Sequence, residues 1–484
     1  MKKKTACIII VICVLIAVTT TVAIDWLYEA FGNLTINEVV FQLKVPMEGT
    51  STQQVWSFLK QCPWKIILFT AILTFALIYP IKKGKKAELI STIASILILI
   101  ISSTRLVIVT DVVGYIINEV NTSTLIEQEY VDPKKVRIEF PEQKRNLIYI
   151  FLESMETTYC AKKDGGLSEK DLIPEISKLA KENLNFSSVP EEIGGAHSPY
   201  GTTWTVAAMT AQTAGVPLKI GIEDNAMSEY SVFLSGAYSI GEILENNGYH
   251  NFLLLGSDAT FGGRRNLFTQ HGNYEIWDYE SAVVENRIGE KVWWGYSDDN
   301  LFKFAKEKIL ELSEKDEPFN FTTLTVDTHF QDGYECEDCV NKWDEQYKNV
   351  ISCSSKKVGE FIEWIKKQDF YENTTIIISG DHLTMQTGGF FEIEEGQEYD
   401  KKVVNLIINP AIEPTNTTRK YSTFDLYPTT LAALGAEIEG NKLALGTNLF
   451  SEEQTLVEKY GIQYVNEELM KTSKFYDNNI LVTE

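Results

Sequence analysis

Three long apolar runs near the N-terminus limit the structures that this chain can form more than any other feature of its sequence. They cover residues 5–24, 66–81 and 89–109. A helix needs about 20 apolar residues to cross a bilayer, so these runs predict three membrane spans. Lysines precede the first run and separate the second from the third, at residues 2–4 and 82–86. Because basic flanks stay in the cytoplasm, we expect a cytoplasmic N-terminus and an extracytoplasmic chain after residue 109.

The charge changes sign at the same place. The net charge is −23, yet residues 1–109 hold 11 basic and 5 acidic side chains, so the remainder carries −29. A basic membrane end followed by an acidic soluble end explains this division, and the acidic part argues against nucleic-acid binding. A cleaved signal peptide is the alternative for the first run, but no clear small-residue cleavage site follows it.

Strand-like and helix-like segments alternate after residue 145, which is typical of an α/β fold. The strand candidates are residues 147–152, 250–255, 320–326, 374–378 and 403–408. The helix candidates include residues 172–182, 205–213, 239–247, 301–313, 356–367 and 423–434. We therefore predict a membrane domain over 1–109, a linker helix and connector over 110–145, an α/β domain over 146–450 and a polar, peripheral tail over 451–484.

Acidic side chains follow two of the predicted strands. Glu153 comes directly after residues 147–152, and Asp381 and His382 follow 374–378 and a Ser-Gly turn. Ligands of open α/β sheets bind beyond the carboxyl ends of the strands, so these three side chains are candidate ligands of a divalent cation. Each signal is weak alone, because a Glu in this position is usually a solvated loop residue. Together they give a metal site about even odds.

A turn rich in hydroxyl groups opens one of the predicted helices. Its sequence is GTTWTVAAM, residues 201–209. A threonine at a helix start is usually an N-cap, and that interpretation wins for Thr202 or Thr203 in isolation. The same position places backbone N–H groups and the positive end of the helix dipole near a phosphoryl oxygen, which suits a threonine nucleophile. The cap and the nucleophile therefore compete.

Two further side chains are candidates for binding a substrate. His329 stands just beyond a predicted strand, in VDTHFQDGY, where it could orient a substrate or transfer a proton. Without other evidence it is an ordinary loop histidine. Arg264 and Arg265 could hold a phosphate, although paired basic residues are normally a solvated surface.

Four cysteines fall in the part expected outside the cell, where disulfides persist: Cys160, Cys336, Cys339 and Cys353. Cys336 and Cys339 have the C-x-x-C spacing, which also occurs in zinc and redox sites. No second such pair is present, so we expect one or two structural disulfides, at about two to one over zinc or redox chemistry. The spacing leaves their connectivity open.

Taken in order, these residues resemble the membrane-bound phosphoglycerol transferases, a family that includes lipoteichoic acid synthase and enzymes that decorate periplasmic glucans. The match consists of Glu153, the turn 201–203, His329 and the pair 381–382, all after N-terminal spans. YKNVISCSSKKVGEFIEWI and STFDLYPTTLAALG look like late helices of the family. The resemblance covers about residues 110–450. It implies an extracytoplasmic sulfatase-like domain with a mixed, mostly parallel sheet flanked by helices, in the alkaline phosphatase and sulfatase superfamily.

The resemblance also implies roles for single residues. Glu153, Asp381 and His382 match ligands of one divalent cation, normally Mn²⁺ or Mg²⁺ in this family. Thr202 matches the nucleophile that also contacts the cation, because Thr205 and Met209 reproduce the local spacing, and Thr203 is a near rival. His329 matches the substrate-orienting histidine, and Arg264 matches the arginine that contacts glycerophosphate.

The implied reaction has two steps and takes place at a multi-pass protein of the cell membrane. Thr202 attacks the phosphorus of phosphatidylglycerol and expels diacylglycerol, and a hydroxyl of a cell-envelope glycan or glycolipid then accepts the glycerophosphate. The acceptor stays open, because lipoteichoic acid synthases usually have five spans, and the turn at 201–209 looks closer to the periplasmic-glucan branch.

Three alternatives remain beside this interpretation. Phosphoethanolamine transferases use a similar threonine and ligand set with Zn²⁺. A sulfatase needs a C/S-x-P-x-R turn, and no such turn occurs near residue 202. A membrane-anchored binding protein that keeps an inactive enzyme fold is the alternative from a different class.

Overall fold

The computed structural model describes residues 3–31, 52–219, 232–386, 391 and 399–482. The chain divides into two compact units whose boundary falls between Glu119 and Val120. The first contains the apolar runs and the second the predicted α/β domain, and each is described by itself.

Among the described residues of the membrane unit, three helices are long and apolar enough to cross a membrane, over Lys3–Tyr28, Trp56–Lys83 and Lys85–Val109. These spans lie in helices α1 (Lys3–Phe31), α3 (Thr52–Ile78) with η1 (Tyr79–Lys83), and α4 (Lys85–Val109). The predicted number of candidate spans is confirmed. Polar contacts join α1 to α4, since Ser102 donates to the Ala17 carbonyl at 2.9 Å. Helix α5 (Val112–Val120) follows.

The second unit is built on a seven-stranded sheet of order β3-β8-β7-β2-β6-β4-β5. The strands are β2 (Asn146–Leu152), β3 (Gly195–Ala196), β4 (His250–Leu255), β5 (Glu275–Trp277), β6 (Phe319–Leu324), β7 (Thr374–Gly380) and β8 (Val403–Ile408). Neighbours from β7 to β5 are parallel, and β8 and β3 are antiparallel. This confirms the mixed, mostly parallel sheet, with short β3 and β5 in addition to the predicted strands.

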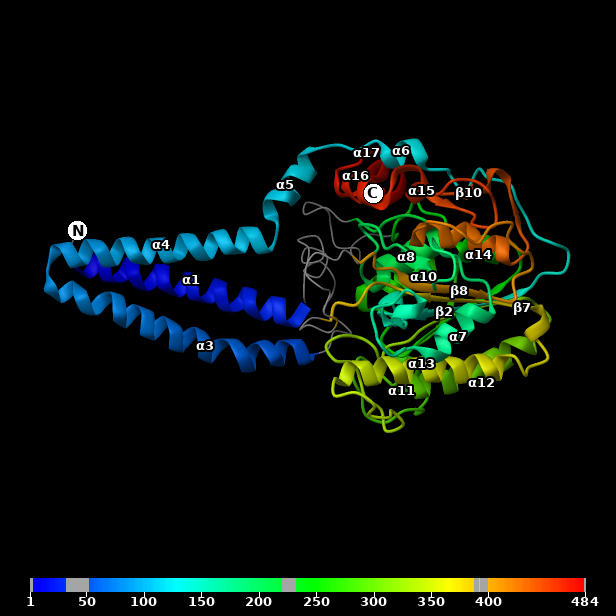
Figure 1. Cartoon of the computed structure of the whole chain (residues 1–484), viewed down its shortest axis with the longest axis horizontal. Helices are drawn as coiled ribbons and strands as arrows, with labels where there is room; N and C mark the ends of the chain where they lie inside the picture. Colours follow the sequence, from blue (N-terminus) through cyan, green and yellow to red (C-terminus); the bar gives the residue numbers. More distant parts are fainter. Residues whose placement is uncertain (1–2, 32–51, 220–231, 387–390, 392–398, 483–484) are drawn as a thin grey trace. The chain divides into compact units, whose positions relative to one another are not determined.

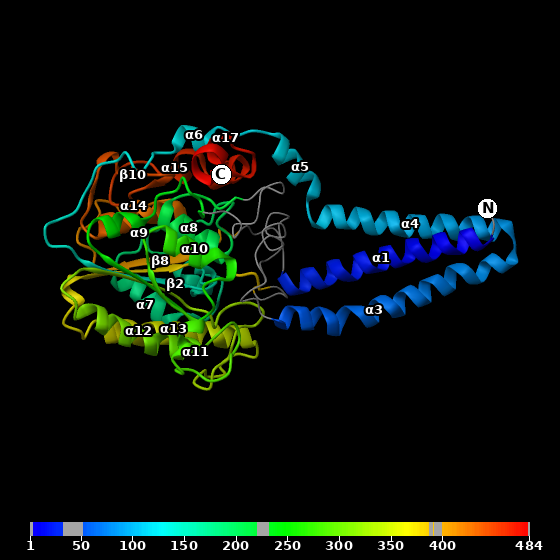
Figure 2. The same cartoon turned by 180° about the vertical axis from the view of Figure 1, so that it is seen from behind.

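Helices cover both faces of this sheet (Figures 1 and 2). One layer contains α8 (Thr205–Ala214), α9 (Ile240–Asn246), α10 (Arg264–Gln270) and α14 (Leu426–Ala433). The other contains α7 (Pro174–Glu182), α11 (Tyr279–Val284), α12 (Asp298–Ser313) and α13 (Gln346–Ile365). Alternate residues of β2 enter different clusters: Tyr149 packs on the α8 side and Ile150 on the α7 side. Two-sided burial explains why this strand is a continuous apolar run.

The chain from 120 to 145 is attached to the domain rather than free. Helix α6 (Leu125–Glu129) is followed by β1 (Ile138–Glu139), which pairs with β9 (Glu437–Ile438). Ser123 donates to the Glu468 carboxylate at 2.7 Å, which ties this segment to the C-terminal helices.

The residues after Phe450 differ from the peripheral tail that their polarity suggests. They form α15 (Leu456–Tyr460), α16 (Ile462–Met470) and α17 (Lys474–Tyr476), after a hairpin of β10 (Lys442–Leu443) and β11 (Gly446–Thr447). Val465, Leu469 and Tyr476 are buried in the same hydrophobic cluster as α8. Most of the polar positions face solvent, although Thr455 and Ser473 are buried, and the few apolar ones suffice to seat these short helices.

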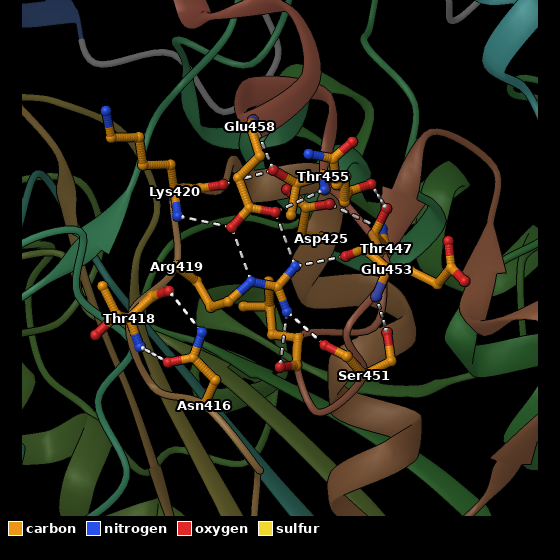
Figure 3. A network of polar contacts seen from close by, with 12 residues as sticks. Asn416, Thr418, Arg419, Lys420, Asp425, Thr447, Ser451, Glu453, Thr455 and Glu458 are labelled. Atoms are coloured by element: carbon orange, nitrogen blue, oxygen red, sulfur yellow. Dashed lines mark hydrogen bonds and ion pairs between the residues drawn. The ribbon is translucent and has the colours of Figure 1, made fainter.

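Arg419 holds the start of this C-terminal segment (Figure 3). Its guanidinium is buried and makes two hydrogen bonds to the Glu458 carboxylate, at 2.8 and 3.0 Å. It also donates to the carbonyls of Leu449, Ser451 and Glu453. Such a charge is stable in a buried position because its donors are paired.

A disulfide links Cys339 to Cys353, with 14 residues of sequence separation. This confirms the expectation of a structural disulfide and gives its connectivity. Cys160 and Cys336 are free and buried.

Candidate metal centre

Sheet register brings the three predicted metal ligands together. Strands β2 and β7 are parallel neighbours in which Leu152 pairs with Gly380. The residues that follow these two positions, Glu153 and Asp381, therefore leave the sheet side by side at its carboxyl edge. His382 is next in the chain. All three side chains are buried, and each offers a ligand atom that lies within 4.8 Å of the others.

Local hydrogen bonds fix how these side chains face one another. His382 Nδ1 lies 2.8 Å from the Leu383 carbonyl, so this nitrogen carries the proton and Nε2 is the unprotonated nitrogen. Nε2 lies 3.5 Å from Glu153 Oε1 and 3.4 Å from Asp381 Oδ2. An unprotonated imidazole nitrogen beside two carboxylate oxygens is a donor set that divalent cations accept.

One oxygen of this cluster lacks a hydrogen bond. Asp381 Oδ1 accepts from the backbone N–H groups of Ser154 and His382, at 2.8 and 2.7 Å. Oδ2 is buried and accepts none. A buried carboxylate oxygen without a partner costs about 1–3 kcal/mol or more, which a bound cation would remove. The residues present therefore fit a metal ion.

The charges of the cluster lead to the same conclusion. Burial, together with the negative charge of Glu153, raises the pKa of Asp381 to about 7. The two carboxylates repel each other in a site closed to water, and a divalent cation reverses that repulsion.

Two hydroxyls reach this cluster: Ser154 donates to Glu153 Oε1 at 2.9 Å, and the other hydroxyl comes from Thr205. Thr205 is the first residue of α8, and its Oγ1 lies 3.5 Å from His382 Nε2. Thr202 was the predicted nucleophile, but its buried hydroxyl donates to the Pro199 carbonyl at 2.7 Å, within the turn. The N-cap of α8 is Trp204, so neither Thr202 nor Thr203 caps the helix. The predicted helix start at residue 205 was the signal that could have identified Thr205.

A buried glutamine, which the sequence analysis missed, joins α8 to the end of β7. The side-chain amide of Gln212 donates to the Gly380 carbonyl at 3.0 Å and to the Asp381 carbonyl at 3.4 Å. Its oxygen accepts from the Tyr149 hydroxyl at 2.9 Å. Gln212 thus couples the helix that begins at Thr205 to the peptide that carries Asp381.

His329 lies in a loop next to the cluster of Glu153, Asp381 and His382. Its Nδ1 is 2.7 Å from the Phe330 carbonyl, and the preceding Thr328 donates to the Glu153 carbonyl at 2.6 Å. The Trp294 ring packs on the imidazole, with 4.6 Å between centroids. Burial lowers the pKa of His329 to about 4, so the ring is neutral at physiological pH.

Arg264 supplies a buried positive charge from the first residue of α10. It donates to the carbonyls of Phe261 and Asp258, at 3.0 and 2.7 Å. Burial lowers its pKa to about 10, against the opposing effect of the Glu153 and Asp381 charges. Arg265 instead pairs with Asp278 at 2.6 Å, so Arg264 is the arginine associated with the cluster.

Comparisons with known proteins agree with this geometry. The family model described as "Sulfatase" matches residues 145–436. Phosphoglycerol transferase I of Escherichia coli is 31% identical over 332 residues, which are 66% of this chain and 41% of that protein. The chain thus spans about two fifths of the length of this curated relative.

Two solved structures share the fold. One is a protein of the alkaline phosphatase superfamily from Vibrio parahaemolyticus, with a TM-score of 0.52 and 20% identity, covering 72% of this chain and 78% of that one. The other is the integral membrane lipooligosaccharide phosphoethanolamine transferase A from Neisseria meningitidis. Its TM-score is 0.50 at 10% identity, covering 88% of this chain and 84% of that one. At these identities the likeness concerns the fold alone.

Proposed function

The chain belongs to the sulfatase family, and from this premise we propose that it is a membrane-bound phosphoglycerol transferase. It moves glycerophosphate from phosphatidylglycerol to a hydroxyl of a cell-envelope glycan or glycolipid. The 31% identity to phosphoglycerol transferase I supports this donor chemistry. The basic flanks of the spans support an N-terminus in the cytoplasm and a catalytic domain on the opposite side.

One observation carries the proposal: the Thr205 hydroxyl stands 3.5 Å from His382 Nε2, which belongs to the Glu153, Asp381 and His382 cluster. These three side chains would hold Mn²⁺ or Mg²⁺, with Zn²⁺ as the alternative. A bound divalent cation favours the alkoxide form of a nearby hydroxyl and offsets charge on phosphoryl oxygens. We assign the nucleophile to Thr205 on this contact, and Thr202 is the rival from the sequence.

The reaction proceeds in two displacements. Thr205 Oγ1 forms a bond to the phosphorus of phosphatidylglycerol, while the bond to the diacylglycerol oxygen breaks and diacylglycerol leaves with a proton. An acceptor hydroxyl then attacks the same phosphorus, gives up its proton and frees Thr205. Arg264 offsets charge on the phosphoryl group, and neutral His329 orients the glycerol by hydrogen bonding. The start of α8 adds the positive end of a helix dipole.

The test uses the full chain in detergent with Mn²⁺ and fluorescent phosphatidylglycerol, and it follows diacylglycerol release. Thr205→Ala should abolish release, and Thr202→Ala, as the matched control, should keep most of it. The reverse pattern would return the nucleophile to Thr202. A parallel assay with phosphatidylethanolamine tests the alternative: cleavage of that lipid alone would make the chain a phosphoethanolamine transferase. If the folded, metal-loaded protein cleaves neither lipid, the chain is a binding protein.

A further inference from the structure

Three sulfur atoms gather in a second cluster, outside the candidate metal centre. Cys336 Sγ lies 3.3 Å from Cys339 Sγ and 3.9 Å from Cys353 Sγ, and the latter two form the disulfide. Two of the cysteines come from a C-x-x-C turn, in which the Cys339 N–H donates to the Cys336 carbonyl. The third lies in helix α13. A structural disulfide needs two cysteines, so the position of Cys336 calls for an explanation.

Disulfide exchange is the first chemistry to consider, and the distances argue against it. In an exchange the attacking sulfur lies in line with the bond that breaks, so its distances to the two sulfurs differ by about one bond length, ~2 Å. For Cys336 the two distances are 3.3 and 3.9 Å. Cys336 therefore lies beside the bond rather than behind it.

The same distances suit a shared metal ion. In tetrahedral thiolate sites the Zn–S distance is about 2.3 Å, which places the sulfurs about 3.8 Å apart. Both separations from Cys336 are within about half an ångström of that value. Reduction of Cys339–Cys353 would let the third pair open to a similar distance.

The charges around Cys336 complete such a site. Lys357 and the Asp299 carboxylate both lie close to Cys336. Lys357 binds Asp299 at 2.9 Å and Asp327 at 2.9 Å. The cluster thus lies beside a carboxylate of a type that serves as a fourth ligand.

We propose that Cys336, Cys339 and Cys353 form a three-thiolate site for a soft or borderline divalent cation such as Zn²⁺ when the disulfide is reduced. A dithiol reductant supplies two electrons and two protons to Cys339–Cys353, and cation binding then displaces the thiol protons. The bound ion replaces the disulfide as the link between the C-x-x-C turn and α13. Sulfur ligands distinguish this site from the oxygen and nitrogen cluster at Glu153, which suits harder cations.

Helix α13 contacts the loop that carries His329 at two points. The link between the C-x-x-C turn and α13 therefore bears on the position of that loop. Tyr347 donates to the Thr328 carbonyl at 2.9 Å, and Lys357 binds Asp327. Either the disulfide or the cation therefore connects the C-x-x-C turn to a helix that supports the substrate side of the centre.

The experiment uses the full chain in detergent, reduced and freed of metal, with Co²⁺ as the probe. Co²⁺ bound to thiolates gives a sulfur-to-metal charge-transfer absorption in the near ultraviolet that oxygen and nitrogen ligands do not give. We expect this band, at saturation, to correspond to one thiolate-bound Co²⁺ per chain in the reduced wild type and to be absent from the oxidised protein. Cys336→Ser should weaken the binding by roughly tenfold or more. Cys160→Ser, a buried cysteine outside the cluster, and Glu153→Gln should leave the band unchanged.

A second measurement needs no variant. Alkylation of the reduced, folded wild type with and without Zn²⁺ should show three additional protected thiols. The proposal is overturned if the reduced protein gives no band, if Cys336→Ser keeps it at full affinity, or if Zn²⁺ protects no thiol. Cys336→Ser retains the Cys339–Cys353 disulfide, so an unchanged melting temperature of the oxidised variant confirms that it folds.

Discussion

The two clusters of ligand atoms in this domain are built in different ways. Glu153 and Asp381 leave adjacent strands whose register is held by the whole sheet. Cys336 and Cys339 lie in a turn, and only Cys353 belongs to a long helix. Oxygen and nitrogen donors at fixed strand ends are ready for an ion at all times, whereas the sulfur cluster depends on its oxidation state. The two proposals thus give one domain a permanent and a conditional site.

The largest effect should come from the permanent site. Asp381→Asn removes the carboxylate whose Oδ2 lacks a hydrogen bond, and with it a ligand of the proposed cation. We expect diacylglycerol release to fall by about 10³-fold or more and bound Mn²⁺ to be lost. Asp400→Asn, at a largely exposed acid, is the control. Full activity and metal content in Asp381→Asn would contradict the proposed metal site at the strand ends.

Loss of the disulfide in the sulfur cluster should lower the free energy of unfolding rather than the rate of diacylglycerol release. Cys353→Ser removes the disulfide, and for a loop of 14 residues the expected loss of unfolding free energy is about 3 kcal/mol. Denaturant unfolding of the oxidised protein measures it, beside Cys336→Ser, which should cost little. If Cys353→Ser abolishes Mn²⁺ binding in the folded protein, the two clusters are not separable.

Substitution of Gln212 tests how far the strand-end site depends on the hydrogen bonds that support it. Gln212→Met removes the buried hydrogen bonds of this side chain with the Gly380 carbonyl and the Tyr149 hydroxyl, which costs about 2 kcal/mol. Because Gln212 contacts the peptide of Asp381, kcat should fall more than KM rises. Tyr149→Phe removes one of the same bonds and should retain kcat. Equal kinetic effects of the two variants would mean that Gln212 only stabilises the fold.

Acid should destabilise the fold through a buried histidine outside the candidate metal centre. Burial lowers the pKa of His197 to about 4, below its usual 6.5. The unfolded chain therefore binds more protons than the folded one between these values, so this contribution to stability is present above pH 6.5 and is lost as the pH falls. At pH 5.5 the loss is about 1.4 kcal/mol. His197→Gln should flatten the decline of the melting temperature between pH 7 and 5.5, and an unchanged slope would contradict it.

Sequence patterns predicted the parts of the site that regular structure determines. Glu153 and Asp381 were identifiable because an apolar strand ends at a known edge of an α/β sheet. The contact of Thr205 with His382 was not predicted, because it depends on where the backbone turns into α8, and Thr202 as the nucleophile stays a prediction. The connectivity of Cys339 and Cys353 depends on the path of the whole chain. The C-terminal helices were taken for a tail because a few apolar residues among polar ones leave a weak pattern.

Arg419 sets a practical limit on how the domain can be shortened. Its guanidinium donates to the carbonyls of Ser451 and Glu453 and to the Glu458 carboxylate (Figure 3). A fragment that stops at Phe450, near the end of the family match, would leave this cation buried without those partners, at a cost of about 3–5 kcal/mol. A fragment for crystallisation or assay therefore needs the chain beyond Glu458, because a boundary drawn from sequence similarity alone would remove these partners of Arg419.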